Sequence, residues 1–193
     1  MIIFCLLIIL AVVLLASWLA APLYYNKRVR KKIERAKHQW AFDGISAKEM
    51  RRLLQRYEPN KWITTNEERK FFDELPDRVT LYRGCCIDEA ISGEYGISWT
   101  ARRDVAEFFA FRYTTEQRAV FSTTISKENI RAVLTEREEA ECLILEPTNV
   151  QVVTTEPTEY YDKYQEFRAE IDRKEQALRA EVAKMWQGLL KNE

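Results

Sequence analysis

The sequence predicts an α+β protein in which about six short strands accompany one internal helix. Three observations support this fold class. Runs rich in β-branched and aromatic residues recur between residues 78 and 155, one helical pattern interrupts them, and further helical patterns lie on both sides. Because strands and helices do not alternate regularly, we do not expect a parallel sheet built from repeated βαβ units.

The N-terminal residues form the most apolar part of the chain. Residues 1–26 carry no charged side chain, and residues 2–20 are apolar nearly throughout. With a rise of about 1.5 Å per residue, roughly 20 such residues form a helix that crosses the hydrocarbon core of a bilayer. We therefore predict a transmembrane anchor over residues 1–26, which contacts the membrane through residues 2–25.

A cleaved signal peptide is the alternative, since Leu19, Ala20 and Ala21 have the small side chains of a cleavage site. The anchor is favoured because no basic residue precedes the apolar run, which also exceeds the roughly 7–15 apolar residues of a signal peptide. Basic residues only follow the run. The positive-inside rule therefore predicts a single-pass protein with its N-terminus outside and its C-terminal domain in the cytoplasm.

Residues 27–77 are expected to form a basic juxtamembrane segment and a helical cover. Basic side chains crowd the start of this region, at positions 27, 28, 30, 31 and 32. Sequences typical of a capping box at Ser46–Glu49 and at Thr65–Glu68 then predict two short helices. Pro59 and Pro76 follow these helices and mark their ends.

The core region, residues 78–155, contains the predicted strands and the internal helix. We expect strands over residues 79–82, 97–99, 119–125, 130–134, 141–145 and 150–153, with the helix over 104–113. In the last region, residues 156–193, apolar residues recur at steps of three and four and predict a long amphipathic helix over 160–190. Its apolar stripe either packs on the core or pairs with a second copy to form a homo-oligomer.

The composition argues against two classes of function. The chain has 30 basic and 30 acidic residues, whereas a protein that binds nucleic acid needs a basic excess on its binding domain. We therefore expect no nucleic-acid partner. Four cysteines and one histidine show no metal-ligand spacing, so no metal site is expected.

Two short motifs in the core region carry candidate ligand-binding groups. Arg83 lies at the end of a predicted strand, and its planar guanidinium suits phosphate or ribose oxygens. Gly84 follows it and permits close approach to the backbone. Ser98 and Thr100 share one face of a later strand, where Ser98 can orient a carboxylate and Thr100 can cap the next helix.

Two glutamates supply the candidate catalytic groups. Glu139 and Glu141 are two residues apart, so they share a face at a strand entrance. Glu141 is the last charge before the apolar residues 142–145, which places it deeper than Glu139 and gives the two carboxylates different tasks. Glu136 and Glu138 have the same spacing and leave the register of the pair open, although no strand follows them directly.

This ordered set of Arg, Ser-x-Thr and Glu-x-Glu within residues 78–153 resembles the arginine–serine–glutamate (R-S-E) class of ADP-ribosyltransferases. The likeness is greatest to small bacterial and phage members. It implies an ADP-ribosyltransferase-like core of two packed, mostly antiparallel sheets, with the substrate NAD bound between them. Together with the predicted anchor, it implies a membrane-anchored mono-ADP-ribosyltransferase that modifies a protein acceptor.

The resemblance also implies a role for each candidate residue. Arg83 would contact the phosphates and the nicotinamide ribose, with Gly84, Ser98 and Thr100 completing the NAD site. Ser98 would steady the catalytic Glu141, and Glu139 would face the acceptor. The related histidine–tyrosine–glutamate class is disfavoured, because the single histidine lies at position 38, outside the core region.

A glutamate at the first position of the pair goes with arginine acceptors in this family. Two features depart from the pattern: Trp99 replaces the small middle residue of the serine motif, and no aromatic residue precedes the glutamates in their loop. The sequence therefore leaves the acceptor residue open. It also leaves two alternatives, a non-catalytic protein that binds NAD or another protein on this fold, and a structural membrane protein that assembles through the C-terminal helix.

Overall fold

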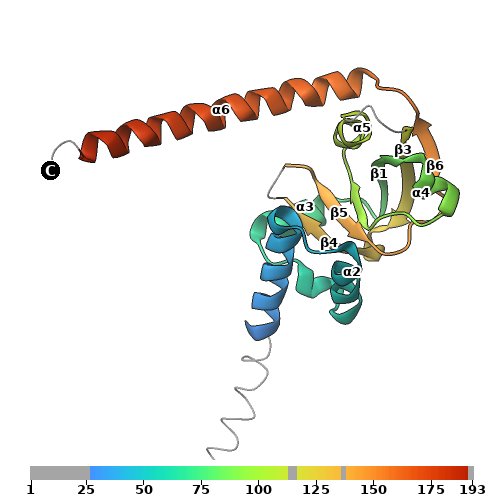
Figure 1. The fold of residues 1–193 in the computed structure, drawn as a ribbon. Coiled ribbons are helices and arrows are strands. Elements are labelled where there is room, and N and C mark those ends of the chain that lie inside the picture. The colour runs from blue at the N-terminus through green and yellow to red at the C-terminus, as the bar shows by residue number, and fades with distance from the viewer. Residues whose placement is uncertain (1–26, 113–116, 136–137, 191–193) are drawn as a thin grey trace, which may run out of the picture.

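The computed structural model describes residues 27–112, 117–135 and 138–190. Their centre is one antiparallel sheet with the strand order β4-β5-β2-β1-β3-β6 (Figure 1). The strands are β1 (Arg78–Cys86), β2 (Ser98–Thr100), β3 (Arg118–Ser126), β4 (Ile130–Leu134), β5 (Glu141–Ile144) and β6 (Gln151–Thr154). The structure is therefore α+β, and each strand overlaps a predicted one.

The predicted pair of packed sheets is wrong, because the structure has a single six-stranded sheet. The cause is β1, which pairs with β3 along its whole length, from Arg78 opposite Ser126 to Cys86 opposite Arg118. On its other side β1 pairs with β2, where Tyr82 lies opposite Thr100. This one strand joins the three strands on one of its sides to the two on the other, a long-range pairing that local sequence patterns do not encode.

The predicted transmembrane helix precedes the part of the chain that the structure describes. It falls on residues 1–26, which lie outside the described residues. Among residues 27–112, 117–135 and 138–190, no helix is both long and apolar enough to cross a membrane.

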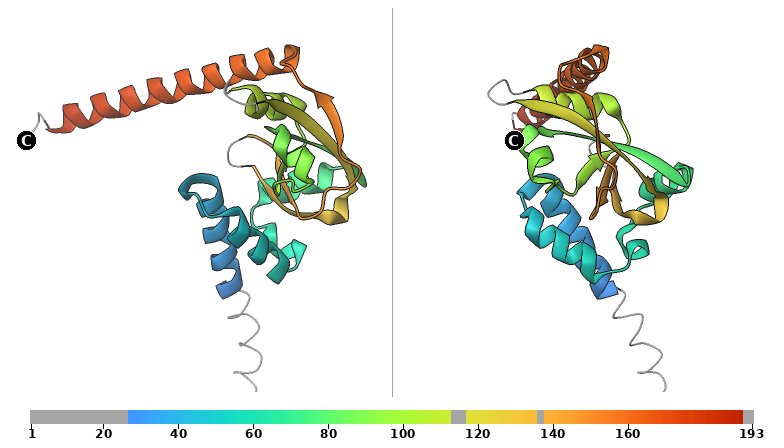
Figure 2. Two further views of the ribbon diagram at one scale, coloured as in Figure 1. Left: turned by 45° about the vertical axis from the view of Figure 1, so that its right-hand side comes forward. Right: turned by 90° about the vertical axis from the view of Figure 1, so that its right-hand side faces the viewer.

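Two groups of helices flank the sheet at opposite ends of the molecule (Figure 2). Residues 27–38, which we call the N-terminal helix, lie together with α2 and α3, whereas α5 and α6 lie at the opposite end. The bounds are η1 (Gln39–Asp43), α2 (Ala47–Arg56), η2 (Pro59–Trp62), α3 (Asn66–Glu74), α4 (Ile87–Ser92), α5 (Arg103–Phe111), η3 (Lys127–Asn129) and α6 (Glu159–Leu190).

Local capping explains where the two cover helices start. Thr65 and Glu68 form a complete capping box at α3, because each side chain bonds the backbone N–H of the other residue. At α2 the Ser46 hydroxyl accepts a hydrogen bond from the Glu49 N–H. Both predicted helix starts are therefore confirmed.

The N-terminal helix belongs to the folded domain, although its basic sequence suggested a juxtamembrane segment. Val29, Ile33 and Ala36, spaced by four and three residues, are buried in a core formed with α2, η2, β4 and β5. Side chains of β5 alternate between this core and a second one, with Leu143 facing the N-terminal helix and Cys142 facing away. Glu141 has the parity of Leu143, so it faces the same side.

The helix α5 packs closely on the sheet because of Gly84 in β1. A Cβ atom at Gly84 would overlap the carbonyl oxygen of Ala106 and lie 2.5 Å from the backbone nitrogen of Ala110. A glycine at this position therefore lets the helix backbone lie directly against the strand.

The helix α6 packs on the domain only along its first turns. Its start is held by the buried Glu107 carboxylate, which accepts hydrogen bonds from the backbone and hydroxyl of Thr158 at 2.7–3.0 Å. Tyr164 is buried, whereas Leu178 and Met185 farther along are exposed. Packing on the core occurs in part: the first turns of α6 contact the core, whereas its distal turns extend away from the body of the protein (Figure 1). Pairing with a second copy remains a prediction.

Candidate active site

A hollow of about 310 Å³ opens on the sheet beside α5. Six of its lining residues are those singled out in the sequence: Arg83, Gly84, Ser98, Thr100, Glu139 and Glu141. They come from β1, β2 and β5, which are neighbours in the sheet, and from the loop just before β5. The structure therefore brings together three motifs that are far apart in the sequence.

The carboxylate of Glu141 is held by two donors on one of its oxygens. The Ser98 hydroxyl donates to Oε1 at 2.5 Å, and the indole N–H of Trp40 donates to the same atom at 2.9 Å. The strand β2 pairs with β5 so that Thr100 lies opposite Glu141 and Ser98 opposite Leu143. Ser98 is therefore the diagonal neighbour of Glu141 and can reach its carboxylate. Glu141 is 4% exposed, so a carboxylate at the base of the hollow is kept in one orientation.

Arg83 is fixed in the wall of the hollow by a second carboxylate. Its Nε and Nη2 donate to Glu89 at 2.8 Å each, and its Nη1 donates to the Ser98 carbonyl at 2.7 Å. Gly96 makes room for this group, since a Cβ atom there would overlap the guanidinium. A guanidinium has five N–H donors, so two remain beyond these three contacts with the described residues.

The Arg83–Glu89 pair shifts the pKa values of both groups. Burial lowers the pKa of Arg83, but the hydrogen bonds and charge of Glu89 outweigh burial and raise that pKa above its ordinary value. Burial raises the pKa of Glu89, but the hydrogen bonds and charge of Arg83, with the bond from the Gly96 N–H, lower it overall. Both groups are therefore charged near neutral pH.

This pair predicts a loss of stability in acid. A carboxylate with a lowered pKa stabilises the fold above its unfolded pKa of about 4.3, and this contribution is lost as the pH falls through the folded pKa. We expect Glu89→Gln to cost about 1–3 kcal/mol at neutral pH. Urea unfolding between pH 3 and pH 7 should show that the free energy of unfolding of Glu89→Gln depends less on pH than that of the wild type. An equal pH dependence of the two proteins would contradict this expectation.

The backbone next to Glu139 is tied to the turn between β2 and α5. The carbonyls of Glu138, Glu139 and Ala140 accept bonds from the Arg102 guanidinium, the Thr100 hydroxyl and the Ala101 N–H, at 2.8, 2.6 and 3.2 Å. Glu138 and Ala140 both have positive φ angles, of 55° and 47°. The loop is therefore fixed in an uncommon conformation, with Glu139 partly exposed on the wall of the hollow.

Thr100 has a different local role from the one expected. The helix α5 starts at Arg103 with Arg102 as its N-cap, so Thr100 is not the cap. Instead the Thr100 hydroxyl accepts from the Arg102 N–H at 2.9 Å and donates to the Glu139 carbonyl. It links the serine motif to the glutamate pair. The alternative pair cannot be compared, because Glu136 lies outside the described residues.

A second hollow of about 330 Å³ adjoins the first between α5 and α6. The two share Phe109, Arg112 and Glu139 as lining residues. Together with Arg118 in the first hollow, Arg112 adds positive charge beside Arg83. The sequence analysis missed these two arginines as well as Trp40 and Glu89, because each reaches the site through tertiary packing and belongs to no local motif.

Comparisons with known proteins add no relative: no protein-family model matches the chain, and no match was found among curated proteins or solved structures.

Proposed function

We propose that the protein is a mono-ADP-ribosyltransferase that transfers ADP-ribose from NAD to a protein acceptor. One observation carries the proposal. The arginine, the serine motif and the two glutamates line a single hollow, in which the Ser98 hydroxyl orients the buried Glu141 carboxylate. This is the set of groups that cleavage of the nicotinamide–ribose bond requires.

The reaction breaks the bond between ribose C1′ and the nicotinamide nitrogen. The electron pair of that bond leaves with nicotinamide, which becomes neutral, and positive charge develops on the ribose. A carboxylate fixed beside the ribose stabilises this charge without having to reorient during the reaction. Glu141 is assigned this role, because Ser98 and Trp40 hold its Oε1.

Arg83 is assigned to the phosphates and the nicotinamide ribose of NAD. Glu89 and Ser98 fix the plane of its guanidinium, and the N–H donors beyond these bonds would serve oxygens of NAD. Arg112 and Arg118 supply further charge for the diphosphate. The first hollow is at the small end of the roughly 300–1,000 Å³ typical of ligand sites, and the adjoining hollow extends it for a dinucleotide.

Glu139 is assigned to the acceptor. It is more exposed than Glu141 and lines both hollows, so it lies where an incoming nucleophile would approach the ribose. An arginine acceptor attacks C1′ through a guanidinium nitrogen, and the proton it loses passes to the Glu139 carboxylate. A fixed acid–base partner of this kind contributes about 10²–10⁴-fold to a rate.

The proposed location is the cytoplasmic face of a membrane. This part of the proposal rests on the uncharged residues 1–26 and on the basic residues that follow them. The catalytic domain would then act on acceptors near the bilayer.

Incubation with adenylate-labelled NAD and a cell extract tests the proposal. The full chain, purified in mild detergent, should transfer label to protein, and Glu139→Gln should reduce transfer by about 10²-fold while reducing NAD hydrolysis far less. If Glu139→Gln instead reduces both equally, Glu139 does not act on the acceptor. Calorimetric binding of NAD with neither transfer nor hydrolysis would support a non-catalytic binding protein instead.

A further inference from the structure

The turn η1, which continues the N-terminal helix, contributes a side chain to the site through Trp40. The indole of Trp40 lines the same hollow as the candidate catalytic residues, and its N–H reaches Glu141 Oε1 at 2.9 Å. An indole N–H is a donor only, so its partner in the site must be an acceptor oxygen, here Oε1 of Glu141. Two donors of different origin, Ser98 in the sheet and Trp40 in the turn after the N-terminal helix, therefore meet at one oxygen.

An irregular turn orients Trp40. It lies in η1, a π-helical turn that continues the N-terminal helix and ends at Gly44 in the left-handed conformation (φ 77°). The N–H groups of Gly44 and Ile45 both bond to the Gln39 carbonyl, at 2.7 and 3.2 Å. Such wide turns are rare and often occur at functional sites.

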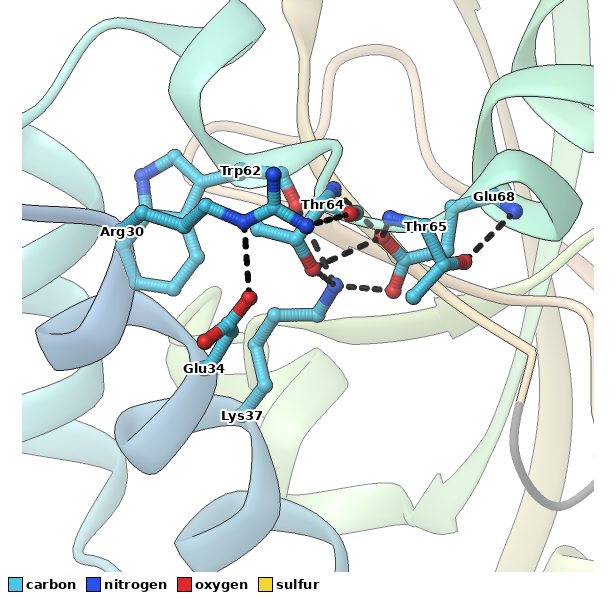
Figure 3. A network of polar contacts seen from close by, with 7 residues as sticks. All are labelled: Arg30, Glu34, Lys37, Trp62, Thr64, Thr65 and Glu68. Carbon is cyan, nitrogen blue, oxygen red and sulfur yellow. Dashed lines mark hydrogen bonds and ion pairs between the residues drawn. The ribbon is translucent and has the colours of Figure 1, made fainter. Parts of the chain in front are cut away.

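A buried ion pair fixes the helix that carries this turn (Figure 3). Lys37 is 2% exposed; its ammonium pairs with the Glu68 carboxylate and also donates to the Trp62 carbonyl and the Thr64 hydroxyl. Glu68 in turn accepts from the N–H groups of Thr64 and Thr65. The pair joins the N-terminal helix to α3, only three residues before Trp40.

We propose that the N-terminal helix completes the catalytic site, with Trp40 as a positioning residue that sets the Glu141 carboxylate. The inference rests on the proposed function. It adds the requirement that a residue outside the sheet, Trp40, must hold the catalytic carboxylate. The Lys37–Glu68 pair holds the helix, the π-helical turn aims the indole, and the indole bond limits rotation of the carboxylate. The rate of NAD cleavage then depends on the attachment of the N-terminal helix to the rest of the domain.

Trp40→Phe tests the role, since it removes the N–H donor and keeps an aromatic ring. We expect kcat for nicotinamide release to fall roughly 10- to 100-fold, because a misplaced catalytic group loses transition-state stabilisation. KM for NAD should change less than about threefold, since the substrate contacts remain. Unchanged kcat, or a rise in KM alone, would overturn the inference.

Trp62→Phe is the matched control. Trp62 is fully buried in the same core, and its indole N–H has no hydrogen-bond partner among the described residues. This variant should keep the wild-type kcat, because the Trp62 carbonyl that accepts from Lys37 remains. A comparable loss of kcat in both variants would show that core packing is responsible, which would overturn the positioning role.

A spectroscopic measurement separates this inference from the proposed function. With ¹⁵N-labelled tryptophan, the indole signal that Trp40→Phe removes should shift when Glu141 is replaced by Gln. An unshifted signal would overturn the contact even in an active enzyme. A shifted signal in a chain that never cleaves NAD would support the contact and overturn the proposed function alone.

Discussion

Replacement of Glu141 by Gln should abolish cleavage of NAD and leave its binding intact. The amide oxygen of Gln can accept the same bonds from Ser98 and Trp40, so the side chain should keep its place. It lacks the negative charge that stabilises the developing cation on the ribose. We expect kcat to fall by at least about 100-fold, with the Kd for NAD measured by calorimetry within a few-fold of wild type.

Glu146→Gln is the control for this variant. Glu146 lies just after β5, is exposed, and does not line the first hollow. It should retain the wild-type kcat and Kd. Undiminished turnover in Glu141→Gln would contradict the assignment of the catalytic carboxylate, whereas a large loss in both variants would point to a general effect of charge.

Replacement of Lys37 by Met should strongly destabilise the fold. Lys37 and Glu68 have side chains only 2% and 1% exposed, so removing the ammonium leaves a buried carboxylate without its charge partner. Breaking a buried pair in this way costs about 3–5 kcal/mol. Urea unfolding of the full chain should show this loss as a lower midpoint, and detachment of the N-terminal helix should also reduce nicotinamide release.

Two further variants test whether the loss of stability comes from leaving a buried charge unpaired or from losing any ion pair. Lys37→Met combined with Glu68→Gln should recover part of the lost stability, because the amide carries no charge and can still accept from the Thr64 and Thr65 N–H groups. Lys174→Met breaks an exposed pair with Glu170 on α6 and should leave stability near wild type. Wild-type stability of Lys37→Met would contradict the role of the buried pair.

The strands and several site residues were predictable because their signals are local. The strand β4 has the bounds expected from its apolar run, and the capping box at Thr65 and Glu68 fixes the start of α3. Glu141 was singled out as the last charge before an apolar run. The structure places it at the first residue of β5 with 4% exposure, on the face of the strand that it shares with Leu143.

The sheet and the rest of the site depend on contacts that no local pattern records. Trp40 reaches Glu141 across 101 positions of sequence. Lys37 lies in a basic helix whose charges suggested a juxtamembrane segment, and its burial depends on Glu68, 31 positions away. Glu89 lies in α4, a six-residue helix with no buried residue, so the apolar periodicity that marks longer helices is missing.

Release of nicotinamide from NAD by the purified full chain tests the central claim most directly. Chromatography should show nicotinamide accumulating with wild-type protein, at a rate lowered by Trp40→Phe and reduced by at least about 100-fold in Glu141→Gln. Absence of nicotinamide release from wild-type protein that is folded and saturated with NAD would contradict the proposed transferase function.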